Sequence, residues 1–124
     1  EERCEAVESF EIALRAHEAA GSLSGGQRKL LEMARVLSTD PEMVLLGEPM
    51  AGVNPTLEEK LLDRIDQLRR DGLTFLLVEH DMDVIMTHCE HIIVMHQGQV
   101  LAEGGADTIQ SDDRVLEAYL GGDV

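Results

Sequence analysis

Two short apolar runs, separated by one amphipathic segment, constrain the fold of this chain most strongly. Residues 43–46 and residues 74–79 are both of strand length and carry almost no polar side chains. Continuous apolar runs of this length are typical of strands buried on both faces of a parallel sheet. Residues 56–71 between them place Leu57, Leu61, Ile65 and Leu68 on one helical face, and Gly72 supplies a helix stop. The order strand, helix, strand predicts a mainly parallel α/β sheet with flanking helices.

Periodic segments on either side extend this pattern. Further helices are expected over residues 3–16, over residues 26–38 with Leu30, Ala34 and Leu37 buried, along a stripe of Met82, Ile85, Met86 and Cys89, and along Val115, Leu116 and Tyr119. Residues 91–96 and 99–103 flank Gln97-Gly98, a dipeptide that favours a tight hairpin turn. The predicted sheet therefore ends in an antiparallel hairpin.

Composition limits the class of protein and of partner. The chain has 124 residues, which is enough for one domain or part of one. Hydrophobic residues make up 44% of it but aromatic residues only 2%, so the core must be aliphatic. The formal net charge of −15 argues against nucleic acid as a partner, because like charges repel. No apolar run reaches the length that a membrane-spanning helix needs.

The segment at residues 23–27, Leu-Ser-Gly-Gly-Gln, opens the predicted helix 26–38. In its structural interpretation, Ser24 is a helix N-cap and Gln27 completes a capping box. In its functional interpretation, Gly25 and Gly26 let a phosphate approach the helix N-terminus closely, and Ser24 adds a hydroxyl donor. The segment alone favours the structural interpretation, and the motifs downstream favour the functional one.

Four motifs in a fixed order carry a family resemblance. The signature segment (residues 23–27) is followed by VLLGEP, AGVNP and VEHDMDVIM, and the chain closes on EAYLG. This order resembles the C-terminal half of an ABC-transporter ATPase, in particular the ATP-binding subunits of branched-chain amino-acid importers. The resemblance implies the C-terminal part of a P-loop NTPase-like fold. It also implies that residues 1–22 end a helical subdomain and that residues 23–124 belong to the ATPase core.

The resemblance gives two residues catalytic roles. Glu48 follows a predicted strand and would orient and deprotonate the water that attacks the γ-phosphate. His80, expected at the end of the second strand, would contact that phosphate. The structural alternatives are a glutamate at a strand-turn junction and an ordinary strand-end histidine.

The resemblance also implies contacts between subunits. ABC ATPases act as head-to-tail dimers, and Ser24, Gly25, Gly26 and Gln27 would reach the nucleotide held by the other subunit. Residues Ala51, Gly52 and Asn54 resemble the loop that crosses to the partner, although Asn54-Pro55 is also an ordinary turn. Arg28 and Lys29 either attract phosphate or are solvated.

Two departures from the family pattern limit the nucleotide chemistry. No G-x-x-x-x-G-K-[ST] phosphate loop occurs in these residues, so the sequence is expected to be a fragment or a truncated product. Gly47 stands where the family has an aspartate that helps hold magnesium, so no metal ligand is expected there. Loss of such a group typically costs about 10–100-fold in affinity or activity. ATP and Mg²⁺, which the intact family member uses, are therefore not expected to bind tightly.

Two functions follow from these observations. The first is part of an ATP-hydrolysing subunit that energises an importer of branched-chain amino acids or similar solutes, cytoplasmic and attached to the membrane through a permease. The second is a non-hydrolysing module that supplies the signature segment to a complete subunit. In the family a further strand lies between strands 74–79 and 91–96. Without that strand, we expect the isolated chain to form a homodimer by exchange of a strand or helix.

Overall fold

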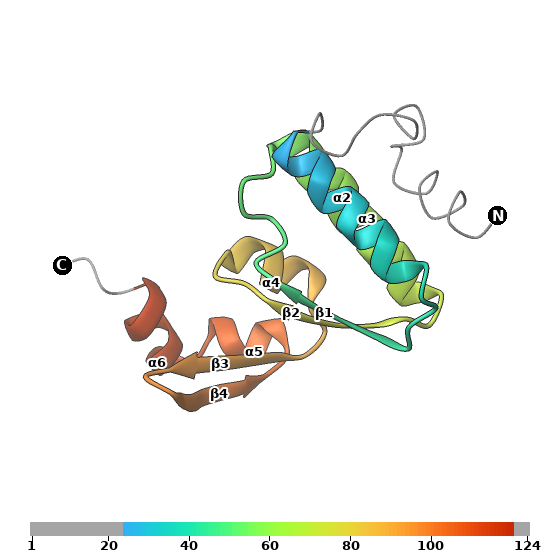
Figure 1. Ribbon diagram of the computed structural model, residues 1–124. Coiled ribbons are helices and arrows are strands. Elements are labelled where there is room, and N and C mark those ends of the chain that lie inside the picture. The colour runs from blue at the N-terminus through green and yellow to red at the C-terminus, as the bar shows by residue number, and fades with distance from the viewer. Residues whose placement is uncertain (1–23, 121–124) are drawn as a thin grey trace. The chain divides into compact units, whose positions relative to one another are not determined.

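The computed structural model describes residues 24–120. These residues form two compact units, one that ends at Val78 and one that begins at Glu79 (Figure 1). Leu23 and the predicted helix over residues 3–16 lie outside the described residues. Among the described helices, none is both long and apolar enough to cross a membrane.

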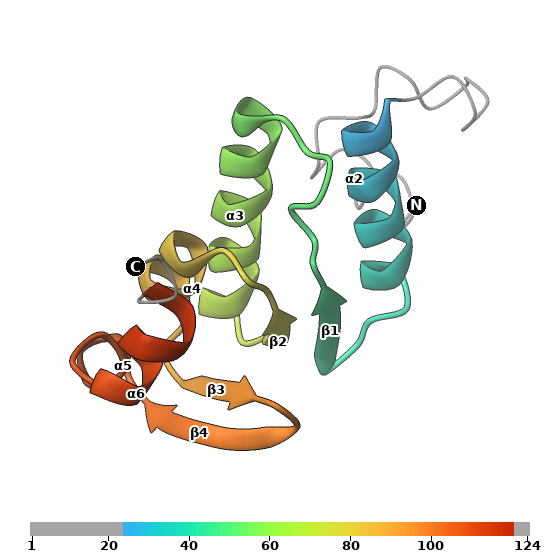
Figure 2. The ribbon, with the colours of Figure 1, turned by 90° about the vertical axis from the view of Figure 1, so that its left-hand side faces the viewer.

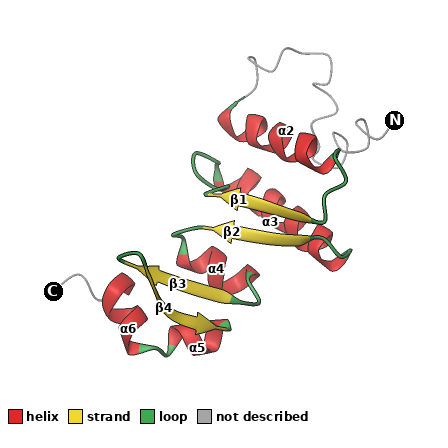
Figure 3. Ribbon diagram, turned by 60° about the horizontal axis from the view of Figure 1, so that its bottom comes forward, coloured by secondary structure: helices red, strands yellow, loops and turns green. Residues whose placement is uncertain are grey.

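The first unit has the predicted order of helix, strand, helix and strand. Its elements are α2 (Gly25–Leu37), β1 (Met43–Gly47), α3 (Pro55–Arg70) and β2 (Thr74–Val78). The two strands run parallel, as their arrowheads show in Figure 3, with Met43 opposite Thr74 and Gly47 opposite Val78. The carboxyl ends of both strands therefore lie at one edge, where α/β proteins place their ligands.

Local chemistry determines where α3 begins and ends. Asn54 is its N-cap, and the side-chain oxygen of Asn54 accepts a hydrogen bond from the Leu57 amide at 2.9 Å. Pro55 occupies the first turn, where a missing N–H has no cost. After the C-cap residue Asp71, Gly72 has a φ of 108°, which only glycine adopts without strain. The predicted helix stop at Gly72 is confirmed.

The strands are covered on one face, so the expectation that both faces are buried is wrong for the described chain. Val44 is 3% exposed, whereas its neighbour Leu45 is 68% exposed. Alternate side chains of a strand point to opposite faces, and the in-register pairing aligns the exposed Leu45 with Leu76. Met43 and Val78 lie on the same exposed face. This face is called the open face of β1–β2 below.

The helices bury most of the predicted stripes. In α2, Leu30 and Ala34 are buried as expected. Leu37 was also predicted to be buried but is only half-buried, and Met33, which was not predicted, is buried. The buried residues of α3 are Leu61, Leu62 and Ile65. The end residues of the predicted α3 stripe, Leu57 and Leu68, are only half-buried. A helix of this length is about 24 Å long and a five-residue strand about 17 Å, so the helix ends extend past the strands.

The second unit is built around the predicted hairpin. It contains α4 (Met82–His88), β3 (Ile92–His96), β4 (Gln99–Gly104), α5 (Ala106–Gln110) and α6 (Asp113–Val115). The antiparallel strands join through Gln97 and Gly98, whose positive φ values of 50° and 77° suit a two-residue hairpin turn. Figure 2 shows the two strands with α5 and α6 beside them.

Helices cover one face of this hairpin. The core consists of Ile92, Val94, Ala102, Ile109 and Val115, and the predicted stripe of Met82, Ile85, Met86 and Cys89 packs against it. The expected last helix is different in form, because α6 is short and continues as a π-helical turn, η3 (Leu116–Leu120). Val115 is buried but Tyr119 is 45% exposed, and its hydroxyl donates to the carbonyl of Met95.

The two strand pairs are separate ladders in the described part of the chain. One pair is parallel (β1–β2) and the other antiparallel (β3–β4). The architecture is α/β with a terminal hairpin, as predicted, but the described sheet is only partly parallel.

Candidate functional site

The signature segment forms the N-terminus of α2. The Ser24 hydroxyl oxygen accepts a hydrogen bond from the Gln27 amide at 3.2 Å, and the Ser24 amide donates to Gln27 Oε1 at 3.0 Å. This reciprocal pair is a capping box, so the structural interpretation of the segment is confirmed. The first amides of a helix have no carbonyl acceptor within the helix. The N–H groups of Gly25 and Gly26 therefore point toward any group that approaches the helix end. The cap thus orders the segment without using those two amides.

The two glycines of this segment differ in their surroundings. A Cβ on Gly26 would lie 2.8 Å from Cδ1 of Leu57 in α3, so this glycine lets the two helices pack closely. A Cβ on Gly25 would meet nothing within 4 Å, and no positive φ requires glycine there. The fold therefore explains Gly26 but gives no packing reason for Gly25.

Glu48 directly follows β1 and is exposed. Its φ is 46°, a left-handed conformation that costs a residue with a side chain on the order of 1–3 kcal/mol. Its amide donates to the carbonyl of Val78 at 2.8 Å, and its carbonyl accepts from the Ala51 amide at 3.1 Å. These bonds hold the Glu48 backbone at the carboxyl end of both strands, where the sequence placed it.

Gly47, the last residue of β1, lacks the carboxylate that the family resemblance calls for. A Cβ at Gly47 would meet nothing within 4 Å, so an aspartate would fit sterically. No group of three or more His, Cys, Asp and Glu side chains suited to a metal ion occurs in residues 24–120. Gly47 itself offers no side chain that could ligate a metal ion.

Lys29 has a role that neither sequence interpretation anticipated. Its ammonium donates to the carbonyl oxygens of Glu48 at 3.1 Å and Pro49 at 3.2 Å. The lysine therefore bonds to backbone carbonyls of the turn after β1, where we had expected either phosphate or solvent. Nineteen residues separate Lys29 from Glu48, and no local pattern signals such a contact.

The predicted partner-crossing loop leads into α3. Ala51 and Gly52 are exposed, and Gly52 has a φ of 72°. Asn54, also exposed, caps α3, so its local role is structural. The position of this loop directly after Glu48 keeps it near the same strand ends.

His80 belongs to the second unit, whereas Glu48 belongs to the first. The expectation that His80 ends the second strand is wrong, because β2 ends at Val78. His80 is exposed and immediately precedes Asp81, the N-cap of α4. Asp81 Oδ1 accepts hydrogen bonds from the amides of Asp83 and Val84 at 3.0 and 3.3 Å. The strand does not continue to His80 because aspartate strongly favours the start of a helix.

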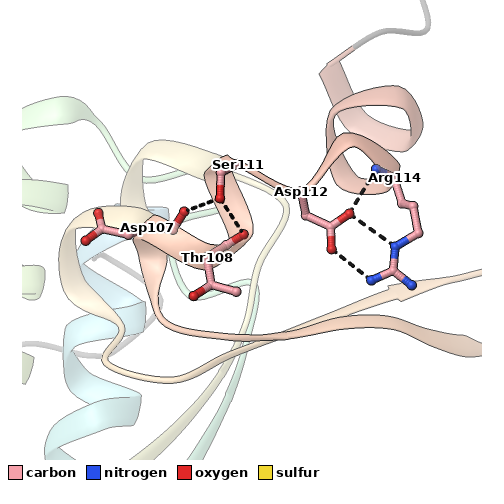
Figure 4. A network of polar contacts seen from close by, with 5 residues as sticks. All are labelled: Asp107, Thr108, Ser111, Asp112 and Arg114. Atoms are coloured by element: carbon pink, nitrogen blue, oxygen red, sulfur yellow. Dashed lines mark hydrogen bonds and ion pairs between the residues drawn. The ribbon is translucent and has the colours of Figure 1, made fainter.

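A second polar cluster, which the sequence did not indicate, joins α5 to α6 (Figure 4). Ser111 Oγ donates to the carbonyls of Asp107 and Thr108 at 2.9 and 3.2 Å. Arg114 pairs with Asp112 at 2.8 Å. The hydrogen bond from this guanidinium holds the pKa of the Asp112 carboxyl below its ordinary value. These contacts satisfy helix ends and present no reactive arrangement.

Comparison with known proteins identifies two matching family models. The model described as "ABC transporter" matches residues 2–51. The model described as "Branched-chain amino acid ATP-binding cassette transporter" matches residues 99–124. The first match includes the signature segment and the turn after β1. The second match begins with β4 and includes η3.

Curated relatives and solved structures agree with these models. A probable branched-chain amino acid transport ATP-binding protein of Archaeoglobus fulgidus is 45% identical over 102 residues, which are 82% of this chain and 40% of that protein. A high-affinity branched-chain amino acid transport ATP-binding protein of Pseudomonas aeruginosa is 40% identical over 93% of this chain and 46% of its own length. A nucleotide-free ATP-binding cassette from an ABC transporter superposes with a TM-score of 0.86 at 36% identity, over 95% of this chain and 48% of that one. The chain thus spans less than half the length of these proteins.

Proposed function

This chain belongs to the ABC-transporter ATP-binding family, and from that premise we propose that it supplies the signature and strand-end part of an ATP-binding subunit. The subunit would energise import of branched-chain amino acids or similar solutes, together with a second ATP-binding subunit and a membrane permease. The proposal draws on the relatives, which are named as ATP-binding proteins for branched-chain amino acid transport.

The open space at Gly25 carries this proposal. A side chain at Gly26 would have to displace the end of Leu57, but a side chain at Gly25 would meet nothing within the described chain. A phosphate seated at the end of α2 would need that space, because it must approach the backbone amides closely. The capping box through Ser24 and Gln27 supports the proposal by keeping those amides ordered. The phosphate would be that of a nucleotide held by the partner subunit.

Glu48 is the candidate for water activation on the chain's own side. Its carboxylate is exposed at the carboxyl end of β1, and the backbone around it is fixed to β2. A carboxylate placed there can orient a water and accept its proton as the water attacks a terminal phosphate. The role that the family resemblance gives to His80, in the second unit, is contact with a γ-phosphate.

A second function, without hydrolysis, is favoured by Gly47. Gly47 cannot provide the metal-holding carboxylate that the family resemblance implies, and positioned charge accounts for nearly all of phosphoryl-transfer catalysis. In this alternative the chain would present Ser24–Gln27 to a complete subunit and hydrolyse nothing itself. We propose that the chain alone lacks measurable ATPase activity. Gly47→Asp would restore a possible metal contact, but no phosphate-loop motif occurs in these residues, so the change should not by itself create nucleotide binding.

The proposal is tested by ATP-dependent association with a complete relative. The Archaeoglobus fulgidus protein, carrying glutamine at its own catalytic glutamate so that ATP persists, would be mixed with this chain and analysed by sedimentation. We expect a complex with ATP and none without nucleotide. Gly25→Glu should abolish the complex by repelling phosphate. It should not harm the fold, because a helix stabilises an acid in its first turn.

Val36→Glu is the matched control for that variant. Val36 is exposed near the far end of the same helix, so the change adds the same charge away from the proposed contact. It should leave association intact. Equal association of the wild type and the Gly25→Glu variant, or association that ignores ATP, would refute the proposal. ATP turnover by the mixture should also be measured with Glu48→Gln in this chain. A lower turnover with that variant would favour the hydrolytic function over the alternative.

A further inference from the structure

We infer that Lys29 is a positioning residue that couples the signature end of α2 to the turn carrying Glu48. The inference rests on the proposed roles of Ser24–Gln27 and Glu48, and goes beyond them by naming the physical link between them. The link is a pair of hydrogen bonds from Lys29 Nζ to the carbonyl oxygens of Glu48 at 3.1 Å and Pro49 at 3.2 Å.

The turn after β1 needs such a contact. Glu48 is held in a left-handed conformation, which persists only where surrounding contacts over-determine it. Its amide is fixed by Val78 of β2, and its carbonyl by the Ala51 amide within the turn. Lys29 supplies a contact from a different helix and binds two successive carbonyls. The two carbonyls belong to the peptide units on either side of the Pro49 Cα, so the two bonds restrain both units where the chain leaves β1.

The other end of the link lies in α2, just beyond the signature segment. Lys29 is two residues beyond Gln27, in the part of α2 that the capping box orders. The Gly26–Leu57 contact also fixes this end of α2 against α3. A shift of the α2 N-terminus, such as phosphate binding at Gly25 would cause, is therefore transmitted through Lys29 to Glu48. One subunit would thus sense the partner's nucleotide at α2 and adjust the glutamate that serves its own.

The type of side chain matters for this link. An ammonium has three donors and can serve two carbonyls at once, and charge-assisted bonds are stronger than neutral ones. Methionine has a similar length but no donor. Arginine keeps the charge and several donors, so Lys29→Arg is the conservative variant. Lys60, the second lysine of the chain, is exposed on α3 and provides a control that removes the same charge.

The experiment uses the 124-residue chain without nucleotide, followed by amide NMR and hydrogen exchange. In Lys29→Met, exchange of the Glu48 and Ala51 amides should be about tenfold faster relative to the β1 amides. In Lys29→Arg most of the protection should return, and in Lys60→Met none should be lost. Unchanged exchange at Glu48 and Ala51 in Lys29→Met would overturn the inference.

Coupling is tested by a second measurement that a merely structural lysine would not affect. Gly25→Glu should shift the Glu48 amide resonance when Lys29 is present and should not shift it in the Lys29→Met background. Equal shifts in both backgrounds would also overturn the inference. Neither measurement involves ATP. Failure of the Lys29 inference can therefore be distinguished from failure of the ATP-dependent association that tests the proposed function.

Discussion

Among the described residues, the unit that ends at Val78 and the unit that begins at Glu79 each contain two strands, but connections of very different length join those strands. In the second unit a two-residue turn joins β3 to β4, so the pairing forms locally. In the first unit β1 and β2 are parallel and are joined through the sixteen-residue helix α3. A parallel pair requires such a crossover. The first unit therefore depends more on contacts between distant residues.

The residues with proposed roles follow this difference. Glu48 is fixed by Val78 and by Lys29, both of which are far from it in sequence. In the second unit, the polar contacts of the α5–α6 junction lie within four residues of each other. The second unit also has a contact between residues far apart in sequence, from the Tyr119 hydroxyl to the Met95 carbonyl. The proposed coupling is assigned to the first unit because the Lys29 contact there reaches the turn that carries Glu48.

Core truncation gives the largest expected effect and shows whether the two units are separately stabilised. Leu61 is 1% exposed in the first unit and Ile109 is 0% exposed in the second. Leu61→Ala and Ile109→Ala should each cost about 2–5 kcal/mol of unfolding free energy through lost burial and a cavity. Hydrogen exchange should show loss of protection mainly in the mutated unit. Uniform loss across both units in either variant would mean that they unfold together.

The glycine pair gives the next largest effect and sharpens the account of the first unit. Gly25→Ala should stabilise the chain by up to about 1 kcal/mol, because alanine favours a helix and its Cβ meets open space. Gly26→Ala should gain less than Gly25→Ala, because its Cβ would force the Cδ1 methyl of Leu57 to move. Urea unfolding of both variants measures the difference. An equal or larger gain for Gly26→Ala would contradict the close packing of α2 and α3.

The open faces test the predicted self-association. Leu45 on β1 and Val100 on β4 are exposed on the uncovered faces of their strand pairs. Leu45→Thr and Val100→Thr should each change stability by no more than about 0.5 kcal/mol. They should nevertheless weaken any homodimer, because large apolar patches drive association. Sedimentation at two salt concentrations should show tighter association at high salt, where repulsion from the net charge of −15 is screened. A monomer under both conditions would remove the homodimer prediction.

The smallest effect is expected at the α5–α6 junction. Because the folded chain lowers the pKa of Asp112 below its ordinary 3.8, the Arg114 contact stabilises the fold above that pH. This contribution is lost as the pH falls through the lowered pKa. Asp112→Asn should therefore be slightly less stable than wild type at pH 6, and the difference should shrink near pH 3. A difference that grows on acidification would contradict the assignment. Urea midpoints at the two pH values provide the measurement.

The fold could be predicted from the sequence where its signals were local. The α2 capping box, the Gly72 stop and the Gln97-Gly98 hairpin follow from side chains within a few residues of each other. Apolar spacing also located the strands and most of the buried helix residues. Predictions failed where burial depended on what packs from outside, as on the open face that contains Leu45.

For the candidate site, the sequence by itself determined the residue types and their order, namely the signature segment, Gly47-Glu48, the loop before α3 and His80. It could not determine that Gly25 faces open space while Gly26 faces Leu57, because the two glycines are chemically identical. Only the tertiary structure brought Lys29 to the carbonyls of Glu48 and Pro49. The physical reason is that such contacts depend on how α2 packs beside β1, and hydrogen bonds to backbone carbonyls require no particular sequence at the acceptor.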